Sequence, residues 1–192
     1  MYEFSKIEIE FLKIETLNSI ELNNFSKKYN EILLGLLSDE NPNKQLILKM
    51  LIEIACANSF SENHKVAIHL FNKIKPYLQT NLVNHFHKNQ VYFCLANSNF
   101  ALKKYRQSLR FFKKFEPAGN EKISNDKLIA ICKTKMINQT LRNLAYIGIF
   151  LLVLKYSILW FFLNYYSPTI SIMGMIGAVC LIPFVIYINL KK

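Results

Sequence analysis

Hydrophobic residues recur every three or four positions along most of the first 143 residues, with polar residues between them. This period is that of a helix with one buried face, and signals for strands are weak throughout. The whole chain has only five Gly and five Pro, and breaks fall at Asn-Pro-Asn (41–43), Pro76 and Pro117–Gly119. The pattern predicts an all-α domain with helices near residues 3–20, 25–38, 43–60, 64–79, 82–101, 105–116 and 121–141.

Two long apolar stretches follow from residue 144. Residues 144–163 carry one charge, Lys155, and residues 169–190 carry none. A helix of about 20 apolar residues crosses a hydrocarbon core about 30 Å thick. A central lysine costs roughly 2.5–3.5 kcal/mol, whereas the surrounding Leu, Ile, Phe and Val residues return roughly 4–8 kcal/mol. We therefore expect a hairpin of two transmembrane helices, with close contact at the small residues Gly174 and Ala178.

Basic residues lie on both sides of this hairpin. Lys133, Lys135 and Arg142 precede the first span, and Lys191 and Lys192 follow the second. Because lysine and arginine stay on the side from which a membrane protein inserts, both ends of the hairpin are expected on that side. The sequence thus predicts an integral membrane protein with both termini on the same side.

Charge is distributed unevenly along the chain. Its 24 basic and 13 acidic residues give a net charge of +11, but residues 63–143 hold 15 of the bases and three of the acids, and no Asp or Glu occurs from Leu144 onward. A basic region next to membrane helices favours anionic lipid head groups, at about 1 kcal/mol for each Lys or Arg near the surface. Nucleic acid is the less favoured partner, because base stacking requires exposed aromatic residues, and packing explains those present.

Signatures of catalysis and of cofactor or metal binding are not found in the sequence. Cys56, Cys94, Cys132 and Cys180 are far apart and are expected to be free thiols. His85 and His87 point to nearly opposite faces of a helix, and no HExxH, GxSxG, GxGxxG or Walker A motif occurs. We expect a protein that is not an enzyme, with no catalytic residues, no cofactor and no metal.

Two segments share a helix-pair pattern. Residues 82–115 carry a large–small pair in the first helix, an aromatic residue opening the second, then a small residue and another aromatic, which is the pattern of a tetratricopeptide repeat. A second copy lies in residues 51–74, with His64 in place of the opening aromatic residue. The residues expected to pack between the helices are Ile54, Ala55, Ala67, Phe71, Leu95, Ala96, Tyr105, Ser108 and Phe112.

The arrangement resembles the mitochondrial fission adaptor family, tail-anchored proteins with two tetratricopeptide-like repeats. VYFCLANSNFALKKYRQSLRFF (91–112) looks like the second repeat of that family, and residues 126–150 resemble its last helix running into the anchor. The chain departs from the family in its second span. The resemblance implies a helical arm or cap over residues 1–42, a repeat domain over 43–143, and a mitochondrial membrane protein that acts as an adaptor or scaffold for other proteins.

By repeat geometry, the first helices of the two repeats would line a groove for a partner. The candidate groove residues are Lys49, Ile52, Cys56, Phe60, Phe93, Asn97, Phe100 and Ala101. Alternatively, these residues are core, covered by the helices near 3–20 and 25–38.

Two other functions stay open. The first is an accessory structural subunit of a large membrane complex, for example of a respiratory chain, in which a neighbouring protein would pair with the intramembrane Lys155. The second, less favoured, is a pore or an immunity-type membrane protein, because the spans offer few polar residues for a lumen.

Overall fold

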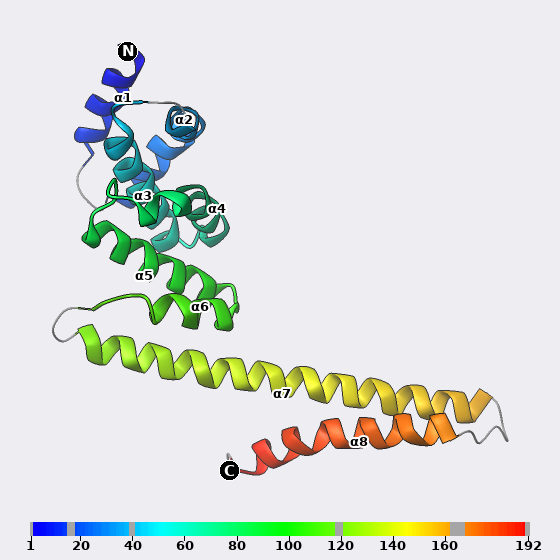
Figure 1. Cartoon of the computed structure of the whole chain (residues 1–192). Helices are drawn as coiled ribbons and strands as arrows, with labels where there is room; N and C mark the ends of the chain where they lie inside the picture. The colour runs from blue at the N-terminus through cyan, green and yellow to red at the C-terminus, as the bar shows by residue number, and fades with distance from the viewer. Residues whose placement is uncertain (1, 15–17, 39–40, 118–120, 162–167, 191–192) are drawn as a thin grey trace. The chain divides into compact units, whose positions relative to one another are not determined.

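The computed structural model describes residues 2–14, 18–38, 41–117, 121–161 and 168–190 of the 192-residue chain. All elements in the described residues are helices, as Figure 1 shows. The chain forms two compact units, Met1–Lys133 and Thr134–Lys192. The prediction of an all-α bundle followed by a helical hairpin is confirmed. The boundary between the units falls inside a helix and precedes the expected boundary at residue 143.

Six α-helices and one short 3₁₀ helix belong entirely to the first unit. They are α1 (Tyr2–Leu12), α2 (Ser19–Ser38), α3 (Lys44–Phe60), α4 (His64–Ile74), η1 (Lys75–Gln79), α5 (His85–Ala101) and α6 (Tyr105–Phe112). The long helix α7 (Glu121–Phe161) begins in the first unit and continues into the second, which also contains α8 (Pro168–Asn189).

Several helix boundaries differ from the expectation: α5 begins at His85 rather than at 82, and α7 continues through residues 142–143, where a break between two helices was expected. The single helix expected over 3–20 was wrong, because α1 ends at Leu12 and α2 begins at Ser19. Asn18 caps α2, since its side-chain oxygen accepts from the backbone N–H of Glu21 at 3.2 Å. The helix expected over 64–79 changes at residue 75 from α4 to the 3₁₀ helix η1, because Pro76 cannot donate a helical hydrogen bond. The helix expected over 105–116, α6, ends at Phe112.

The core of the first unit lies around α3, which packs against α2, α4 and α5. α3 is buried along most of its length, so it is the central helix of the bundle. Fully buried residues such as Leu51, Leu70 and Phe71 fill the space between the helices, and the ring of Phe11 packs at a tilt against that of Phe25, with 5.6 Å between the ring centres. Burial of this apolar surface supplies the main driving force for folding of the unit.

Small polar residues join α3 to α5 and α5 to α6. The hydroxyl groups of Ser59 on α3 and Ser98 on α5 lie 2.8 Å apart, and Ser59 also donates to the backbone oxygen of Cys94 at 3.2 Å. Ser108 on α6 donates to the backbone oxygen of Ala96 at 2.8 Å. These side chains are small enough to let helices approach closely, and each hydroxyl is satisfied inside the core.

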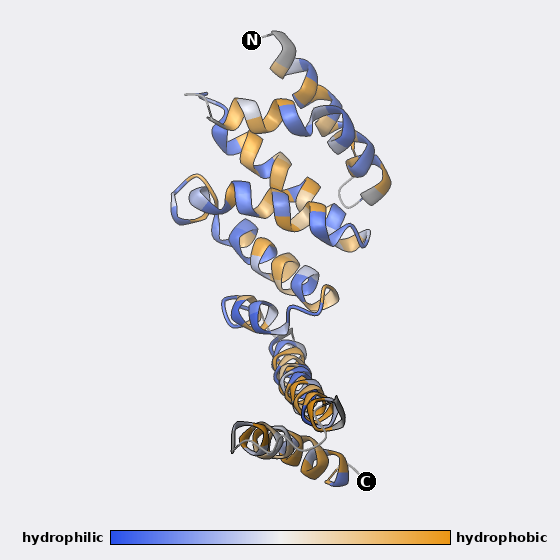
Figure 2. Ribbon diagram, turned by 90° about the vertical axis from the view of Figure 1, so that its right-hand side faces the viewer, coloured by the Kyte–Doolittle hydropathy of each residue, from blue (hydrophilic) through white to orange (hydrophobic). Residues whose placement is uncertain are grey.

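The second unit is a hairpin of two helices that are long and apolar enough to cross a membrane. Figure 2 shows hydrophobic residues along almost all of α8, whereas the helices of the first unit mix hydrophobic and hydrophilic positions. The backbones of the two helices approach closely at Gly148 and Gly177, since a Cβ built on Gly148 would be 2.7 Å from the backbone oxygen of Gly177. Gly174 is buried as expected, but the expectation for Ala178 was wrong: it is exposed, and Gly177 takes the contact position.

Candidate partner-binding site

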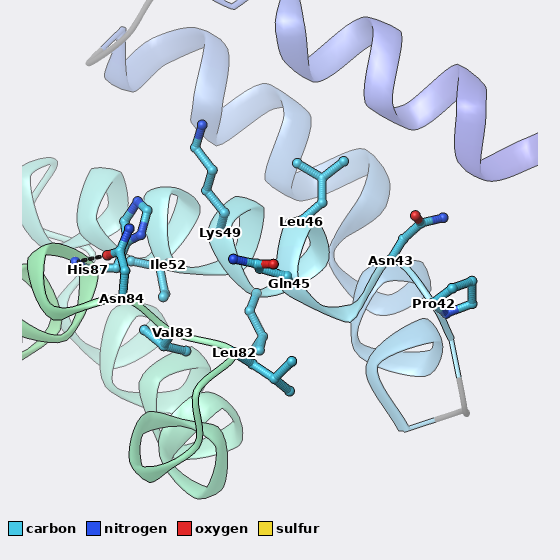
Figure 3. Close-up of a pocket in the computed structure, with 11 residues that line it drawn as sticks. Pro42, Asn43, Gln45, Leu46, Lys49, Ile52, Leu82, Val83, Asn84 and His87 are labelled. Carbon is cyan, nitrogen blue, oxygen red and sulfur yellow. Dashed lines mark hydrogen bonds between the residues drawn. The ribbon is translucent and has the colours of Figure 1, made fainter.

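A pocket with a volume of about 490 Å³ opens between α3 and the segment that leads into α5. Its floor is apolar and comes from Leu48, Ile52 and Val83, which are almost completely buried. The other lining residues form a mixed rim, and Figure 3 labels them together with Ile52 and Val83. They are Pro42, Asn43, Gln45, Leu46, Lys49, Leu82, Asn84 and His87.

The start of α5 shapes one wall of this pocket. Asn84 is extended (φ −72°, ψ 166°), and its side-chain oxygen accepts from the backbone N–H of His87 at 2.8 Å. This cap fixes the direction in which the chain enters α5. As a result, Val83 faces the core while Asn84 and His87 stay on the rim of the pocket, as seen in Figure 3.

The rim carries the positive charge of Lys49, and an acid, Glu53, lies near it outside the pocket lining. Lys49 lies 4.0 Å from Glu53, one helical turn further along α3. Burial raises the pKa of Glu53, although the nearby Lys49 opposes this shift. Burial and the charge of Lys49 lower the pKa of His87. The pocket therefore presents the ammonium group of Lys49 beside a histidine that resists protonation.

The structure divides the candidate groove residues on α3 into pocket, core and surface. Lys49 and Ile52 line the pocket. Cys56 lies in the core, where a hydrogen bond with Cys94 and burial raise its pKa well above the usual range. Phe60, at the end of α3, is 55% exposed and does not line the pocket.

The groove residues on α5 lie away from the pocket. Phe93 packs against Phe112 at a ring distance of 6.4 Å, and Phe100 packs against Tyr105 at 5.5 Å. Both rings fill the space beside α6 rather than line an open surface. Asn97 is half-buried and Ala101 is exposed. The predicted groove is thus an open pocket at its α3 end, while its two α5 aromatic rings serve packing.

The nine residues assigned to repeat packing lie together inside the helix pairs α3/α4 and α5/α6. Eight of them are buried: Ile54, Ala55, Ala67, Phe71, Leu95, Ala96, Ser108 and Phe112. Tyr105 is half-buried against Phe100. Ser108 also lies 3.4 Å from the sulfur of Cys132 on α7, which links the second pair to that helix.

Sequence reasoning missed Leu82, Val83, Asn84 and His87, which make the α5 side of the pocket. The sequence Asn84-Xaa-Xaa-His87 does contain a signal, because asparagine is a preferred N-cap three residues before the backbone group that it accepts from. That signal places the helix start at His85 instead of 82. It does not reveal that α3 forms the other side of the pocket, because the contact between α3 and residues 82–87 joins segments far apart in the chain.

The remaining site predictions fall on α7 and beyond. Lys133, Lys135 and Arg142 are exposed, whereas Lys191 and Lys192 lie outside the described residues. Lys155 is half-buried, and its side chain crosses Gly174 of α8: a Cβ built on Gly174 would lie 2.5 Å from Cδ and 2.7 Å from Nζ of the lysine.

Among the residues that the structure describes, no group of three His, Cys, Asp or Glu is placed to hold a metal ion. Comparison with protein-family models, with curated proteins and with solved structures finds no match to this chain.

Proposed function

We propose that this protein is a membrane-anchored helical adaptor that holds other proteins at a membrane, without catalysis of its own. The observation that carries the proposal is the pocket on α3, which lies on a helical bundle whose chain continues into two helices long enough to span a bilayer. A fission-adaptor-like role and a mitochondrial membrane belong to the same proposal and rest on the resemblance of residues 91–112 and 126–150.

The chemistry of the pocket indicates the kind of segment that it would receive. Its buried floor of Leu48, Ile52 and Val83 suits an apolar anchor residue, and energetically dominant contacts gather around such anchors. Lys49 on the rim suits an acidic residue beside that anchor. We therefore propose a protein segment with one large apolar side chain flanked by an acid as the occupant.

Anionic lipid head groups are the second proposed partner. Six exposed basic side chains lie on α6 and its flanks, in a stretch without any acid: Lys103, Lys104, Arg106, Arg110, Lys113 and Lys114. Basic residues near an anionic bilayer surface each contribute about 1 kcal/mol of attraction.

The test is gentle detergent extraction from the native membrane, followed by native-gel sizing and mass spectrometry of the proteins that co-migrate. Lys49→Glu reverses the charge on the rim and is expected to lower the yield of the partner about tenfold or more. Lys73→Glu is the matched control, because Lys73 is exposed on α4 away from the pocket. Equal partner yields from wild type and Lys49→Glu would refute the pocket as the binding site.

A second candidate function, an accessory subunit of a large membrane complex, is favoured by the position of Lys155 within the hairpin. In that case the chain would run quantitatively in one large assembly, and Lys49→Glu would leave its size unchanged. An adaptor would instead be recovered alone or as a small oligomer together with a partner that Lys49→Glu releases.

A further inference from the structure

Lys155 differs from every other charged residue in the described chain, because it lies inside the interface of the apolar hairpin. A Cβ on Gly174 would meet its Cδ at 2.5 Å and its Nζ at 2.7 Å, so the lysine occupies the space that the glycine leaves free. In the described part of the chain its ammonium group has neither a hydrogen bond nor an ion pair. An uncompensated ammonium group in an apolar environment is costly, and a partner would remove that cost.

The depth of Lys155 argues against a head group as this partner. Along the helix, Lys155 lies about 9 Å from Phe161 at the end of α7 and about 16 Å from Leu144. Its side chain does not extend toward either end but lies across Gly174, at the level of the interface. Because side chains lean toward the N-terminus of their helix, Lys155 also leans away from the nearer end at Phe161. A lipid phosphate at the membrane surface is therefore poorly placed to reach it.

The composition of the spans excludes a second copy of this chain as the source of an intramembrane acid. No Asp or Glu occurs from Leu144 to Lys192. A carboxylate at the depth of Lys155 must therefore come from a different protein. A helix is the structure that can present it there, since backbone groups in a bilayer must be satisfied within their own segment.

The surface of α8 beside the ammonium group is small enough for another helix to approach. Ser171 and Ala178 are the neighbours of Gly174 three residues before it and four residues after it. Ser171 is half-buried and Ala178 is exposed. Small residues at such a surface allow close contact between helix backbones in a membrane.

We propose that Lys155, together with the surface around Ala178, is a docking site for a transmembrane helix of another protein that carries one Asp or Glu. The hairpin is then an interaction module as well as an anchor. This inference rests on the proposed membrane placement of the hairpin and is independent of the pocket on α3.

The test uses the full chain in its native membrane. Lys155→Met removes the charge but keeps an unbranched side chain over Gly174, and Lys155→Arg keeps the charge. Removing one partner of a buried ion pair is strongly destabilising, so Lys155→Met is expected to lower co-purification of the partner at least about tenfold, whereas Lys155→Arg retains it. Ala178→Phe blocks the small surface and is expected to act like Lys155→Met. Val179→Phe is its control, because Val179 is exposed and adjacent in sequence but projects from another side of α8.

A photo-reactive residue at position 178 identifies what lies there. The proposal requires a cross-link to a protein whose spanning helix contains an Asp or Glu. It also requires that Lys155→Asp, combined with a lysine in place of that acid, restores the lost assembly. Cross-links to lipid alone, to a second copy of this chain, or to a helix without an acid would overturn it.

Alkaline carbonate extraction separates this proposal from the proposed function. Retention of the wild type in the membrane, with unchanged assembly of Lys155→Met, refutes the docking site and leaves the adaptor intact. Release of the wild type by carbonate refutes the membrane placement and the docking site together.

Discussion

The two units of this protein are built from the same kind of helix but pack in opposite ways. In the first unit the largest side chains are fully buried, among them Phe71, Phe112 and Leu33. In the described part of the second unit four of the five buried residues are alanine or glycine, and bulky residues such as Phe150 and Val153 are exposed. Large residues thus form the interior of one unit and the exterior of the other.

The physical cause of this inversion is the solvent that each unit is suited to. Water favours burial of large apolar side chains, so the first unit gathers them around α3. In lipid, apolar side chains gain nothing by leaving the solvent, and helices associate through close backbone packing instead. The contact between Gly148 and Gly177 is of the second type.

The largest expected effect comes from removing a core side chain of the first unit. Phe71→Ala deletes a ring with no exposed surface, and such changes cost about 3–5 kcal/mol. We expect a large drop in the thermal midpoint measured by circular dichroism, with the hairpin helices retained. Phe86→Ala is the control, since Phe86 is 65% exposed and its loss should be nearly neutral. A similar loss for both variants would contradict the burial of Phe71.

The same substitution, glycine to alanine, is expected to have opposite signs in the two units. Gly148→Ala places a methyl group 2.7 Å from the backbone oxygen of Gly177, and overpacking of this kind costs about 1–3 kcal/mol. Gly35→Ala in α2 meets nothing within 4 Å and should stabilise the first unit by about 0.5–1 kcal/mol.

Two measurements check this pair of variants. SDS titration of the chain in bicelles, followed by pulse proteolysis, reports pairing of the hairpin, and the thermal midpoint reports the first unit. Destabilisation of the hairpin by Gly148→Ala and a higher midpoint for Gly35→Ala are expected. If Gly148→Ala leaves the stability of the hairpin unchanged, close contact between the backbones of α7 and α8 does not stabilise it.

The smallest expected effect concerns the half-buried Glu53 beside the pocket. Because burial raises its pKa, the stability that Glu53 contributes is complete below its unfolded pKa and falls as the pH rises through the folded value. Glu53→Gln, which cannot ionise, should therefore equal the wild type near pH 4 and exceed its thermal midpoint slightly at pH 7. The exposed Glu31→Gln is the control and should show no such trend. A variant that loses stability at pH 7 would show that the ion pair with Lys49 outweighs burial.

Local patterns were sufficient to predict the helices, because a helical period and its caps lie within a few residues of sequence. The break between α1 and α2 was placed near residue 20 instead of before Ser19, although the sequence does contain the cap in Asn18-Xaa-Xaa-Glu21. The burial of large and small residues such as Ile54 and Ala55 could also be predicted, because their spacing in the repeat pattern alone specifies which face of the helix they occupy.

Features that depend on two distant segments could not be predicted in the same way. The choice of Gly177 over Ala178 depends on the antiparallel register of α7 and α8, and both residues satisfy the spacing rule from Gly174. The pocket depends on where Val83 and His87 meet α3, which no local period encodes. The α5 aromatic residues of the predicted groove were misplaced for the same reason, because Phe93 and Phe100 turn toward α6.

On the proposed membrane placement, the pairing of Lys155 with Gly174 also sets an order of events during biosynthesis. Lys155 leaves the ribosome before the helix that covers it, so α7 alone would enter the bilayer with a bare lysine at a cost of roughly 2.5–3.5 kcal/mol. Once α8 has been made, Gly174 provides the space in which that side chain lies. Gly174 supplies room but no charge, and the apolar residues of α7 outweigh the lysine cost, so the ammonium group still lacks a partner when the hairpin closes. The expected order is therefore insertion of α7, closure of the hairpin by α8, and then docking of the acidic helix.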